Sequence, residues 1–313
     1  MNILFHHQVS DKLKETFRSL SNDEFRITFC EGYGQEFNSL LQETNVIWHV
    51  LTPLTADIIS SAPALRLIQK IGVGVNTIDL EAAEAHSVKV CNMPGTNSRA
   101  VAEMVLLLIM ATLRRLTMLH NACHKGKGWS LAPETFDSIS EIHGKTIGLI
   151  GNGAIPKIIT PILEAMGARV LYTDRSTSAK DNHGRRDLKQ LVREADILSI
   201  HVPLTEQTYN MIGEEELFNM KKGSVLINTA RGEVVDEAAL FKALTSGHLS
   251  GAGLDVFAEE PLPKDNALLR LDNVVTTPHI AWRTQETMRR SFDVALENCR
   301  RLNSGEELLH RVV

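Results

Sequence analysis

Cysteine is scarce in this sequence, and its few cysteines form none of the patterns that usually build a site. Cys30, Cys91, Cys123 and Cys299 are scattered along 313 residues, and no two of them form a Cys-x-x-Cys pair. Disulfide frameworks and structural zinc sites need cysteines at short, repeated spacings. We therefore expect four reduced thiols, as in a cytosolic protein, with no disulfide framework and no metal site.

Long hydrophobic runs are missing as well. The longest apolar segment, residues 105–113, is much shorter than the roughly 20 residues that a membrane-spanning helix needs, so it predicts a buried helix. The first residues, MNILFHHQVSDKLKE, contain neither a sustained apolar stretch nor a cleavage site. We expect no signal peptide and a cytoplasmic location.

A strong excess of charge is also absent, because the formal net charge is only −5 at pH 7. This charge gives no reason to expect a nucleic acid or an anionic membrane as partner. The sequence contains no repeat, low-complexity tract or Ser/Gly-rich linker. Its composition, 43% hydrophobic and 23% charged, is typical of a globular protein with one large or two ordinary domains.

Short apolar strands alternate with amphipathic helices, which predicts parallel sheets with helices on both faces. The first series of strands is expected at residues 2–5, 25–29, 46–50, 67–71 and 88–91. A long helix, about residues 97–120, precedes a second series at 146–150, 169–173, 197–200, 224–228, 251–255 and 273–276. A last helix, about 284–303, can return to the first domain. The predicted fold class is α/β, with two doubly wound domains and a ligand cleft between them.

The segment GNGAIP begins like a dinucleotide-binding turn. Gly151 permits the tight turn, and Gly153 lets the backbone approach a pyrophosphate. The N–H groups of Ala154 and Ile155 can point at a phosphate on the helix N-terminus. Pro156 stands where the G-x-G-x-x-G pattern has its third glycine; it suits a first helical turn, but its bulk predicts weakened or shifted cofactor contact. The alternative is a strand, turn and helix that bind nothing.

The next strand ends at Asp174, about twenty residues after the glycines, where a carboxylate accepts the ribose hydroxyls of NAD and repels the 2′-phosphate of NADP. The neighbouring Arg175 could accommodate that phosphate, so NADP is the less favoured cofactor. An aspartate at a strand end can also be only a helix cap or a turn former.

Three later strand ends each offer one polar side chain: Arg231, Glu260 and His279. Ligands of doubly wound sheets bind beyond the carboxyl ends of the strands. Taken singly, these residues could be a surface cation, a solvated loop residue and a packed histidine. Their occurrence at successive strand ends, after a nucleotide-type turn, favours one joint site.

In combination and in order, these motifs resemble those of the D-isomer-specific 2-hydroxyacid dehydrogenase family, which includes glyoxylate/hydroxypyruvate reductases and phosphoglycerate dehydrogenase. The resemblance covers nearly the whole chain, in GVGVNTIDLEAAEAHSVKVCNMPGTNSRAVAEMVLLLIM, the glycine turn, HVPLTEQT, INTARGEVVDEAAL, GLDVFAEEPLP and TPHIAW. It implies an enzyme that transfers a hydride between NAD(H) and a small 2-keto or 2-hydroxy acid.

The resemblance also implies a role for each candidate residue. Arg231 holds the substrate carboxylate and polarises the keto oxygen. His279 is the acid/base, and Glu260 hydrogen-bonds its imidazole and favours the protonated form. The remaining implied contacts are those of the carboxylate with Val73 and Gly74, of the nicotinamide with Asp255, Thr229 and Ala230, of the adenine with Val202 and Pro203, and of the substrate with Trp282. Taken alone, the tryptophan is a packing residue.

An assembly is implied in the same way. The catalytic domain, residues 1–97 plus 284–313, has a flavodoxin-like fold, and a Rossmann-type NAD-binding domain, residues 98–283, is inserted into it. The resemblance further implies a homodimer formed through the cofactor domain and its long helix, near residues 97–125. It also implies lobes that close over the substrate.

Other functions on this fold stay open. The main alternative is an NAD-sensing regulatory protein similar to the family's corepressor branch, and the departures at Ala154 and Pro156 give it weight. The formate dehydrogenase branch lacks a glutamate paired with the histidine, whereas Glu260 is present here. The substrate pocket is expected near Leu51, Thr52 and Trp282, and its apolar residues admit many keto acids.

Overall fold

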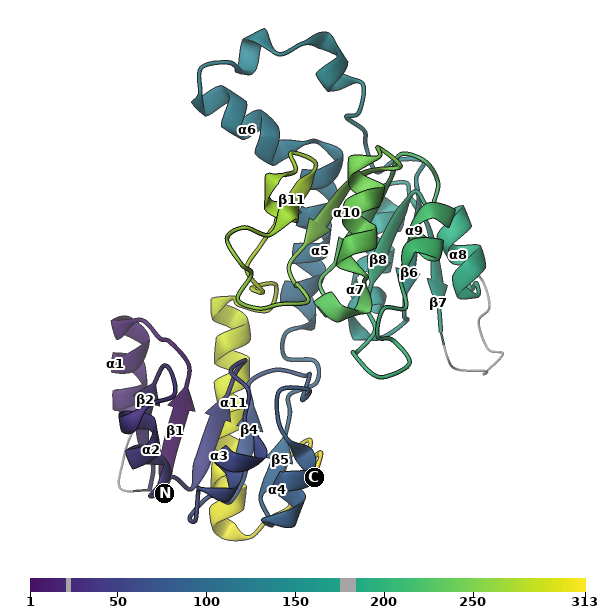
Figure 1. Ribbon diagram of the computed structural model, residues 1–313. Coiled ribbons are helices and arrows are strands. Elements are labelled where there is room, and N and C mark those ends of the chain that lie inside the picture. Colours follow the sequence, from purple (N-terminus) through teal and green to yellow (C-terminus); the bar gives the residue numbers. More distant parts are fainter. Residues whose placement is uncertain (21–23, 175–183) are drawn as a thin grey trace. The chain divides into compact units, whose positions relative to one another are not determined.

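A computed structural model describes residues 1–20, 24–174 and 184–313 (Figure 1). Arg175, considered above as a neighbour of Asp174, lies outside these described residues. The chain folds into two compact units. Unit 1 comprises Met1–Asn97 and Thr284–Val313, and unit 2 comprises Ser98–Arg283. Each unit contains one parallel sheet, so the predicted class of two doubly wound α/β domains is confirmed.

Unit 1 has a five-stranded sheet in the order β2-β1-β3-β4-β5, which is the flavodoxin-like order. Its strands are β1 (Asn2–His6), β2 (Arg26–Cys30), β3 (Val46–His49), β4 (Leu67–Lys70) and β5 (Lys89–Cys91). Its helices are α1 (Asp11–Leu20), α2 (Gln35–Leu41), α3 (Ala56–Ser60), α4 (Leu80–Ala85) and α11 (Gln285–Ser304). Every residue of β3 and β4 is buried, as expected for central strands covered on both faces.

The last helix of the chain belongs to unit 1. The side chain of Thr284 caps its first turn by accepting from the Thr287 N–H. Phe292 stacks on Trp48 of β3, with ring centroids 5.8 Å apart. The Asn298 amide donates to the side-chain oxygen of Gln69 at 2.6 Å. A helix far along the sequence thus completes the core of the first sheet.

Unit 2 has a six-stranded sheet in the order β11-β10-β9-β8-β6-β7. Its strands are β6 (Thr146–Ile150), β7 (Arg169–Thr173), β8 (Ile197–Ile200), β9 (Ser224–Asn228), β10 (Leu249–Leu254) and β11 (Val274–Thr276). A single parallel bridge from Tyr172 to Arg185 continues the sheet beyond β7. With that bridge counted as a third strand, the order is the Rossmann order, and it reverses between β6 and β8.

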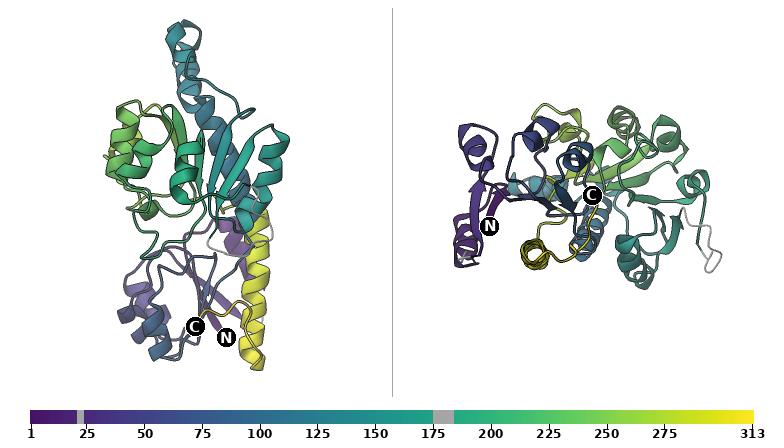
Figure 2. Two further views of the ribbon diagram at one scale, coloured as in Figure 1. Left: turned by 90° about the vertical axis from the view of Figure 1, so that its right-hand side faces the viewer. Right: turned by 90° about the horizontal axis from the view of Figure 1, so that it is seen from below.

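Helices cover the second sheet, and a long arm extends from it. The helices are α5 (Ser98–Leu113), α6 (Leu116–His124), α7 (Ala154–Ala165), α8 (Leu188–Glu194), α9 (Glu214–Asn219) and α10 (Glu237–Thr245). Short 3-10 helices are η1 (Gly128–Ser130), η2 (Pro133–Phe136), η3 (Gly232–Val234) and η4 (Ala267–Arg270). The arm, residues 114–137, contains α6, η1 and η2 and extends beyond the end of α5 in Figures 1 and 2.

The prediction of one continuous helix over residues 97–120 is wrong. Helix α5 ends at Leu113, and α6 begins at Leu116. Between them Arg115 adopts a left-handed conformation, with φ 51°, and its Nε donates to Ser138 Oγ at 3.2 Å. A left-handed residue interrupts the i→i−4 hydrogen bonds of a helix. No glycine or proline lies at the break, so the continuous apolar periodicity predicted one helix through this position.

Three features of the described residues bear on the class of protein. All four cysteines are free thiols, and only Cys123 is exposed. Within residues 1–20, 24–174 and 184–313, no group of His, Cys, Asp and Glu side chains is arranged to hold a metal ion. No helix in these same stretches combines the length and the apolar character that spanning a bilayer requires.

Candidate active site

The glycine turn follows β6 at the point where the strand order reverses. Gly151 has φ 105°, and a Cβ at this position would lie 2.8 Å from the carbonyl oxygen of His201, just beyond β8. Its N–H donates to Thr173 Oγ1 at the end of β7. A larger residue would therefore push neighbouring strand ends apart. Gly153 caps α7, and a Cβ there would meet no atom within 4 Å, so the backbone is open to a ligand.

Pro156 lies in the first turn of α7 and is buried, which confirms its predicted place. Ala154 and Ile155 precede it as the first two residues of the helix. The first N–H groups of a helix have no partner within the helix. These two donors and the positive end of the helix dipole thus face the same turn, as an anion-binding site requires.

A cavity of about 900 Å³ opens at this turn. Its lining includes Gly151, Gly153, Asp174, Arg185, Val202 and Pro203. The Asp174 carbonyl accepts from Arg185 Nη2 at 2.9 Å, which fixes the end of β7. The structure thus brings the predicted pyrophosphate, ribose and adenine residues to one cavity at the switch point, where doubly wound folds bind nucleotides.

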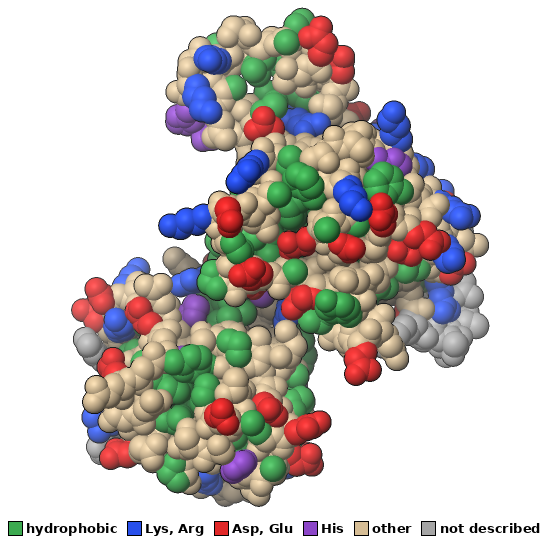
Figure 3. Space-filling view, in the orientation of Figure 1, with side chains coloured by type: hydrophobic (Ala, Val, Ile, Leu, Met, Phe, Trp, Pro, Cys, Tyr) green, Lys and Arg blue, Asp and Glu red, His purple; other side chains and the backbone are tan. Residues whose placement is uncertain are grey.

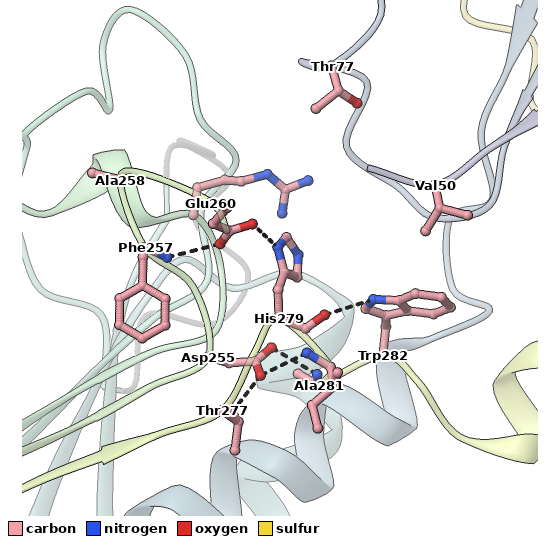
Figure 4. Close-up of polar contacts among 12 residues, drawn as sticks. Val50, Thr77, Asp255, Phe257, Ala258, Glu260, Thr277, His279, Ala281 and Trp282 are labelled. Carbon is pink, nitrogen blue, oxygen red and sulfur yellow. Dashed lines mark hydrogen bonds and ion pairs between the residues drawn. The ribbon is translucent and has the colours of Figure 1, made fainter. Parts of the chain in front are cut away.

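A second group of residues lies at the carboxyl ends of β9, β10 and β11, where Asp255 organises one turn. Asp255 has no exposed surface, and its Oδ1 accepts from Thr277 Oγ1 at 2.5 Å and from the Ile280 N–H at 2.9 Å. Its Oδ2 accepts from the Ala281 N–H at 2.8 Å. Burial raises the pKa of this carboxyl, although these hydrogen bonds and His279 act against the rise. Asp255 therefore holds the turn of residues 277–281 (Figure 4).

His279 is the residue that this turn presents. Its φ of 53° is left-handed, a conformation that costs of order 1–3 kcal/mol in a residue other than glycine and persists where surrounding contacts enforce it. Here the His279 N–H donates to the carbonyls of Asp255, at 2.7 Å, and Thr277, at 3.1 Å. Trp282 Nε1 donates to the His279 carbonyl at 3.1 Å. The imidazole is thus fixed through its own backbone.

Glu260 and His279 form a close polar pair, with Glu260 Oε2 2.6 Å from His279 Nδ1 (Figure 4). The other oxygen, Glu260 Oε1, accepts from the Phe257 N–H at 3.0 Å. Burial would raise the pKa of Glu260, but the His279 hydrogen bond and charge, the Phe257 N–H and the charge of Arg231 outweigh it and lower the pKa. At neutral pH Glu260 is therefore a carboxylate, and His279 Nδ1 must donate to it.

Arg231 follows β9 in the same group. Burial lowers the pKa of its guanidinium, and the charges of Glu260 and Glu233 oppose that shift. An arginine nevertheless stays charged at neutral pH. The charges of Arg231 and Glu260 each shift the pKa of the other side chain, so the two groups interact electrostatically.

The backbone before Arg231 is held by one asparagine. Asn228 Oδ1 accepts from the Ala230 N–H at 3.0 Å, and Asn228 Nδ2 donates to the Arg231 carbonyl at 2.8 Å. Thr229 Oγ1 is buried and has no hydrogen-bond partner among the residues that the structure describes. An orphaned buried hydroxyl at the carboxyl end of a central strand fits a polar ligand group.

Gly232 is a site residue that the sequence analysis missed. A Cβ on Gly232 would lie 1.9 Å from the Phe257 carbonyl carbon and 2.2 Å from the Ala258 nitrogen. The loop of Arg231 and the loop of Glu260 can therefore touch only because residue 232 is glycine. Glu237, also missed, accepts from the Ala258 N–H at 2.6 Å and fixes the second loop. Neither role follows a local sequence pattern, because both depend on contact between distant loops.

In unit 1, the loop after β4 carries Val73 and Gly74, which the sequence analysis assigned to the carboxylate. The Gly72 carbonyl accepts from the Met93 N–H at 2.8 Å, and the Val73 carbonyl accepts from Asn92 Nδ2 at 2.9 Å. In a trans peptide the N–H points opposite to the preceding C=O. The N–H groups of Val73 and Gly74 therefore point away from residues 92 and 93, fixed as a pair of donors.

The comparisons with known proteins agree on one family. Residues 106–281 match the family model of the D-isomer specific 2-hydroxyacid dehydrogenase NAD binding domain. The glyoxylate reductase of Korarchaeum cryptofilum is 39% identical over 259 residues, which cover 81% of this chain and 78% of that protein. The hydroxypyruvate reductase of Thermotoga maritima is 37% identical over 289 residues, which cover 90% and 93%.

A solved structure shows the same likeness. The D-lactate dehydrogenase of Aquifex aeolicus, complexed with NAD and lactic acid, is 30% identical to this chain. It superposes with a TM-score of 0.86 over 97% of this chain and 96% of its own.

Proposed function

Because this chain belongs to the D-isomer specific 2-hydroxyacid dehydrogenase family and is an NAD-dependent oxidoreductase, we propose that Arg231, Glu260 and His279 interconvert a small 2-keto acid and its 2-hydroxy acid. The observation that carries this proposal is the 2.6 Å contact between Glu260 Oε2 and His279 Nδ1. A carboxylate on one ring nitrogen leaves the other, Nε2, to exchange a proton with substrate.

When bound, NADH would provide the hydride for reduction of the keto carbon. His279 Nε2 donates a proton to the keto oxygen, so the C=O group becomes CH–OH and the imidazole becomes neutral. Glu260 stabilises the imidazolium that precedes this step. In the direction of oxidation, the neutral imidazole removes the hydroxyl proton.

Arg231 and the loop of unit 1 bind the substrate. The planar guanidinium of Arg231 holds the carboxylate and places positive charge at the keto oxygen, where negative charge develops. Val73 and Gly74 donate their N–H groups to the carboxylate. Trp282, fixed through the His279 carbonyl, borders the substrate.

The cofactor residues follow from the cavity and from the strand ends. The N–H groups of the glycine turn bind the pyrophosphate. The Asp174 carboxylate accepts hydrogen bonds from the ribose hydroxyls, and Val202 and Pro203 flank the adenine. Thr229 and Ala230 face the nicotinamide. Asp255 acts on the nicotinamide side by holding the turn of residues 277–281 in place.

The arm, together with exposed residues of α5, is our candidate for a homodimer interface. Leu107 and Met110 of α5 are 53% and 46% exposed, Leu116 of α6 is 51% exposed, and Trp129 of η1 is fully exposed. Hydrophobic side chains are visible on the surface of the arm in Figure 3. Large apolar side chains exposed at several positions of one segment favour a protein partner. Light scattering should give twice the chain mass of 34.7 kDa, and a monomer mass would contradict the proposal.

A turnover screen tests the proposed reaction. Glyoxylate and hydroxypyruvate, the substrates that the names of the relatives suggest, should each be tried with NADH and with NADPH. We expect oxidation of NADH, and His279→Ala should lower kcat by roughly 10²–10⁴-fold, the usual contribution of a positioned proton donor. His86→Ala, at an exposed histidine of unit 1, serves as the matched control.

The outcome also separates the enzyme from the sensor. Binding of NAD without turnover of any keto acid would favour the NAD-sensing alternative. Turnover that survives in His279→Ala would remove the histidine from its proposed role.

A further inference from the structure

A lysine is buried beneath the loop that we propose for the substrate carboxylate. Lys70, the last residue of β4, is only 4% exposed. Its Cε lies 3.6 Å from the position that a Cβ on Gly72 would take, so the side chain runs along the start of the loop. Its ammonium donates to the Val50 carbonyl and, at 3.2 Å, to Thr77 Oγ1. A positive charge is thus held inside the loop of Val73 and Gly74.

A neighbouring histidine keeps this ammonium in place without adding a charge. His49 pairs with Lys70 in the register of β3 and β4, and its Nε2 lies 2.8 Å from Thr77 Oγ1. Burial, together with the charge of Lys70 and of two other histidines, holds the pKa of His49 well below its usual value. His49 is therefore neutral at neutral pH. The hydrogen bond between His49 Nε2 and Thr77 Oγ1 holds in place the oxygen that accepts from Lys70.

The hydrogen bonds around the loop fix the position of the Lys70 ammonium before a ligand binds. The carbonyls of Gly72 and Val73 are tied to residues 92 and 93, and the ammonium is tied to the ends of two loops. Neither group has to move when a ligand binds, and fixed charges in a desolvated site act more strongly than the same charges in water.

We propose that Lys70 is a positioning residue that makes this loop selective for anions, because its ammonium adds positive potential beneath the Val73 and Gly74 N–H groups. A carboxylate is then favoured there over a neutral group of the same shape. The inference rests on the proposed function, since it takes the substrate carboxylate to bind this loop. Lys70 itself need not touch the substrate.

The test compares a carboxylate with its neutral counterpart. Oxamate is an unreactive analogue of a 2-keto acid, and oxamide is the same molecule with an amide in place of the carboxylate. Their dissociation constants would be measured on the enzyme with NADH bound. In Lys70→Met, we expect oxamate to bind about tenfold more weakly and oxamide to change less than twofold. Lys70→Arg, which keeps the charge, should retain most of the preference for oxamate.

A matched control removes the same charge from the same sheet. Lys89, the first residue of the neighbouring strand β5, lies at the amino end of the strands, whereas Lys70 lies at the carboxyl end of β4. Lys89→Met should therefore leave both dissociation constants unchanged. If Lys70→Met does not fold, Lys70→Gln keeps a polar side chain near Thr77 and makes the same comparison.

Each other result contradicts the inference. Equal weakening of oxamate and oxamide would mean that Lys70 only supports the loop, and unchanged oxamate binding would mean that its charge has no effect. If the wild type reduces keto acids but Lys70→Met binds oxamate normally, only this inference fails. If the wild type neither turns over a keto acid nor binds oxamate, the proposed function fails with it.

Discussion

Single residues explain how a histidine at the end of a strand can be held ready for proton transfer. Asp255 binds the turn of residues 277–281 through three hydrogen bonds, and Glu260 binds the imidazole of His279 itself. The two carboxylates have different roles, because Asp255 fixes the backbone of the turn and Glu260 fixes the imidazole ring. The lowered pKa of Glu260 keeps it an acceptor at neutral pH.

The contact at Gly232 leads to a prediction at this scale. Gly232→Ala would place a Cβ 1.9 Å from the Phe257 carbonyl carbon, so the loop of Arg231 or that of Glu260 must move. We expect a loss of about 1–3 kcal/mol in the free energy of unfolding, the usual cost of overpacking, and a lower kcat. Denaturant titration and turnover check both values. Gly32→Ala, where a Cβ would meet no atom within 4 Å, is the control.

A wild-type kcat in Gly232→Ala would show that the contact between the two loops is unimportant for the reaction. Equal losses in Gly232→Ala and Gly32→Ala would remove the steric argument.

The sequence could predict Arg231, Glu260 and His279 as candidates because each follows a recognisable apolar strand within a family motif. It could not predict the contact of Gly232 with residues 257 and 258, nor the place of Lys70. Both depend on which loops meet after folding, and no local spacing encodes that meeting.

At the scale of elements, α7 shows what the missing third glycine changes. Pro156 is buried in the first turn, where its ring replaces the hydrogen of a glycine. The helix contains a second proline, Pro161, in the middle of its length, and the side chain of Pro161 is exposed to solvent. Two prolines in one short helix allow their effects on the cofactor to be separated.

We predict that Pro156→Gly lowers the KM for NADH severalfold, because a glycine lets the helix approach the strand and its N–H groups approach the pyrophosphate. Steady-state kinetics with a saturating keto acid measure this KM. Pro161→Ala should leave the KM for NADH unchanged, because Pro161 is remote from the glycine turn. A KM that is unchanged or higher in Pro156→Gly would show that the proline does not limit cofactor contact.

The strands could be predicted closely, whereas one helix could not. Buried strands of a parallel sheet are continuous apolar runs bounded by turns, so their positions are readable from the sequence. The helix break at Arg115 could not be predicted from the sequence, because an arginine adopts the left-handed conformation that is usually found at glycine.

At the scale of the whole molecule, buried histidines determine how acid changes the free energy of unfolding. In unit 1, His6 and His49 are fully buried. Burial, helped by the charge of His7, lowers the pKa of His6 from 6.5 to about 4, and burial also holds the pKa of His49 well below its usual value. In the unfolded chain both histidines bind protons near pH 6.5, whereas in the folded chain they do not. The free energy of unfolding therefore falls as the pH drops below 6.5.

We predict that the thermal midpoint of the wild type falls between pH 6.5 and pH 4, with His6 alone accounting for a loss of up to about 3 kcal/mol at the lower limit. His6→Phe keeps an aromatic ring against Phe37 and Tyr33 and removes the titration. Its midpoint should fall less steeply, as measured by calorimetry at a series of pH values. Identical slopes for the two proteins would contradict this assignment.

The family match confirms the resemblance drawn from the motifs, and with it the class of enzyme and the NAD cofactor. The individual site residues remain predictions that rest on the geometry of each unit. One measurement tests them most directly, a crystal structure of the enzyme with NADH and oxamate. We predict that the oxamate oxygen equivalent to the keto oxygen lies within hydrogen-bond distance of both His279 Nε2 and the Arg231 guanidinium. An oxamate bound elsewhere, or one that contacts neither side chain, would contradict the account.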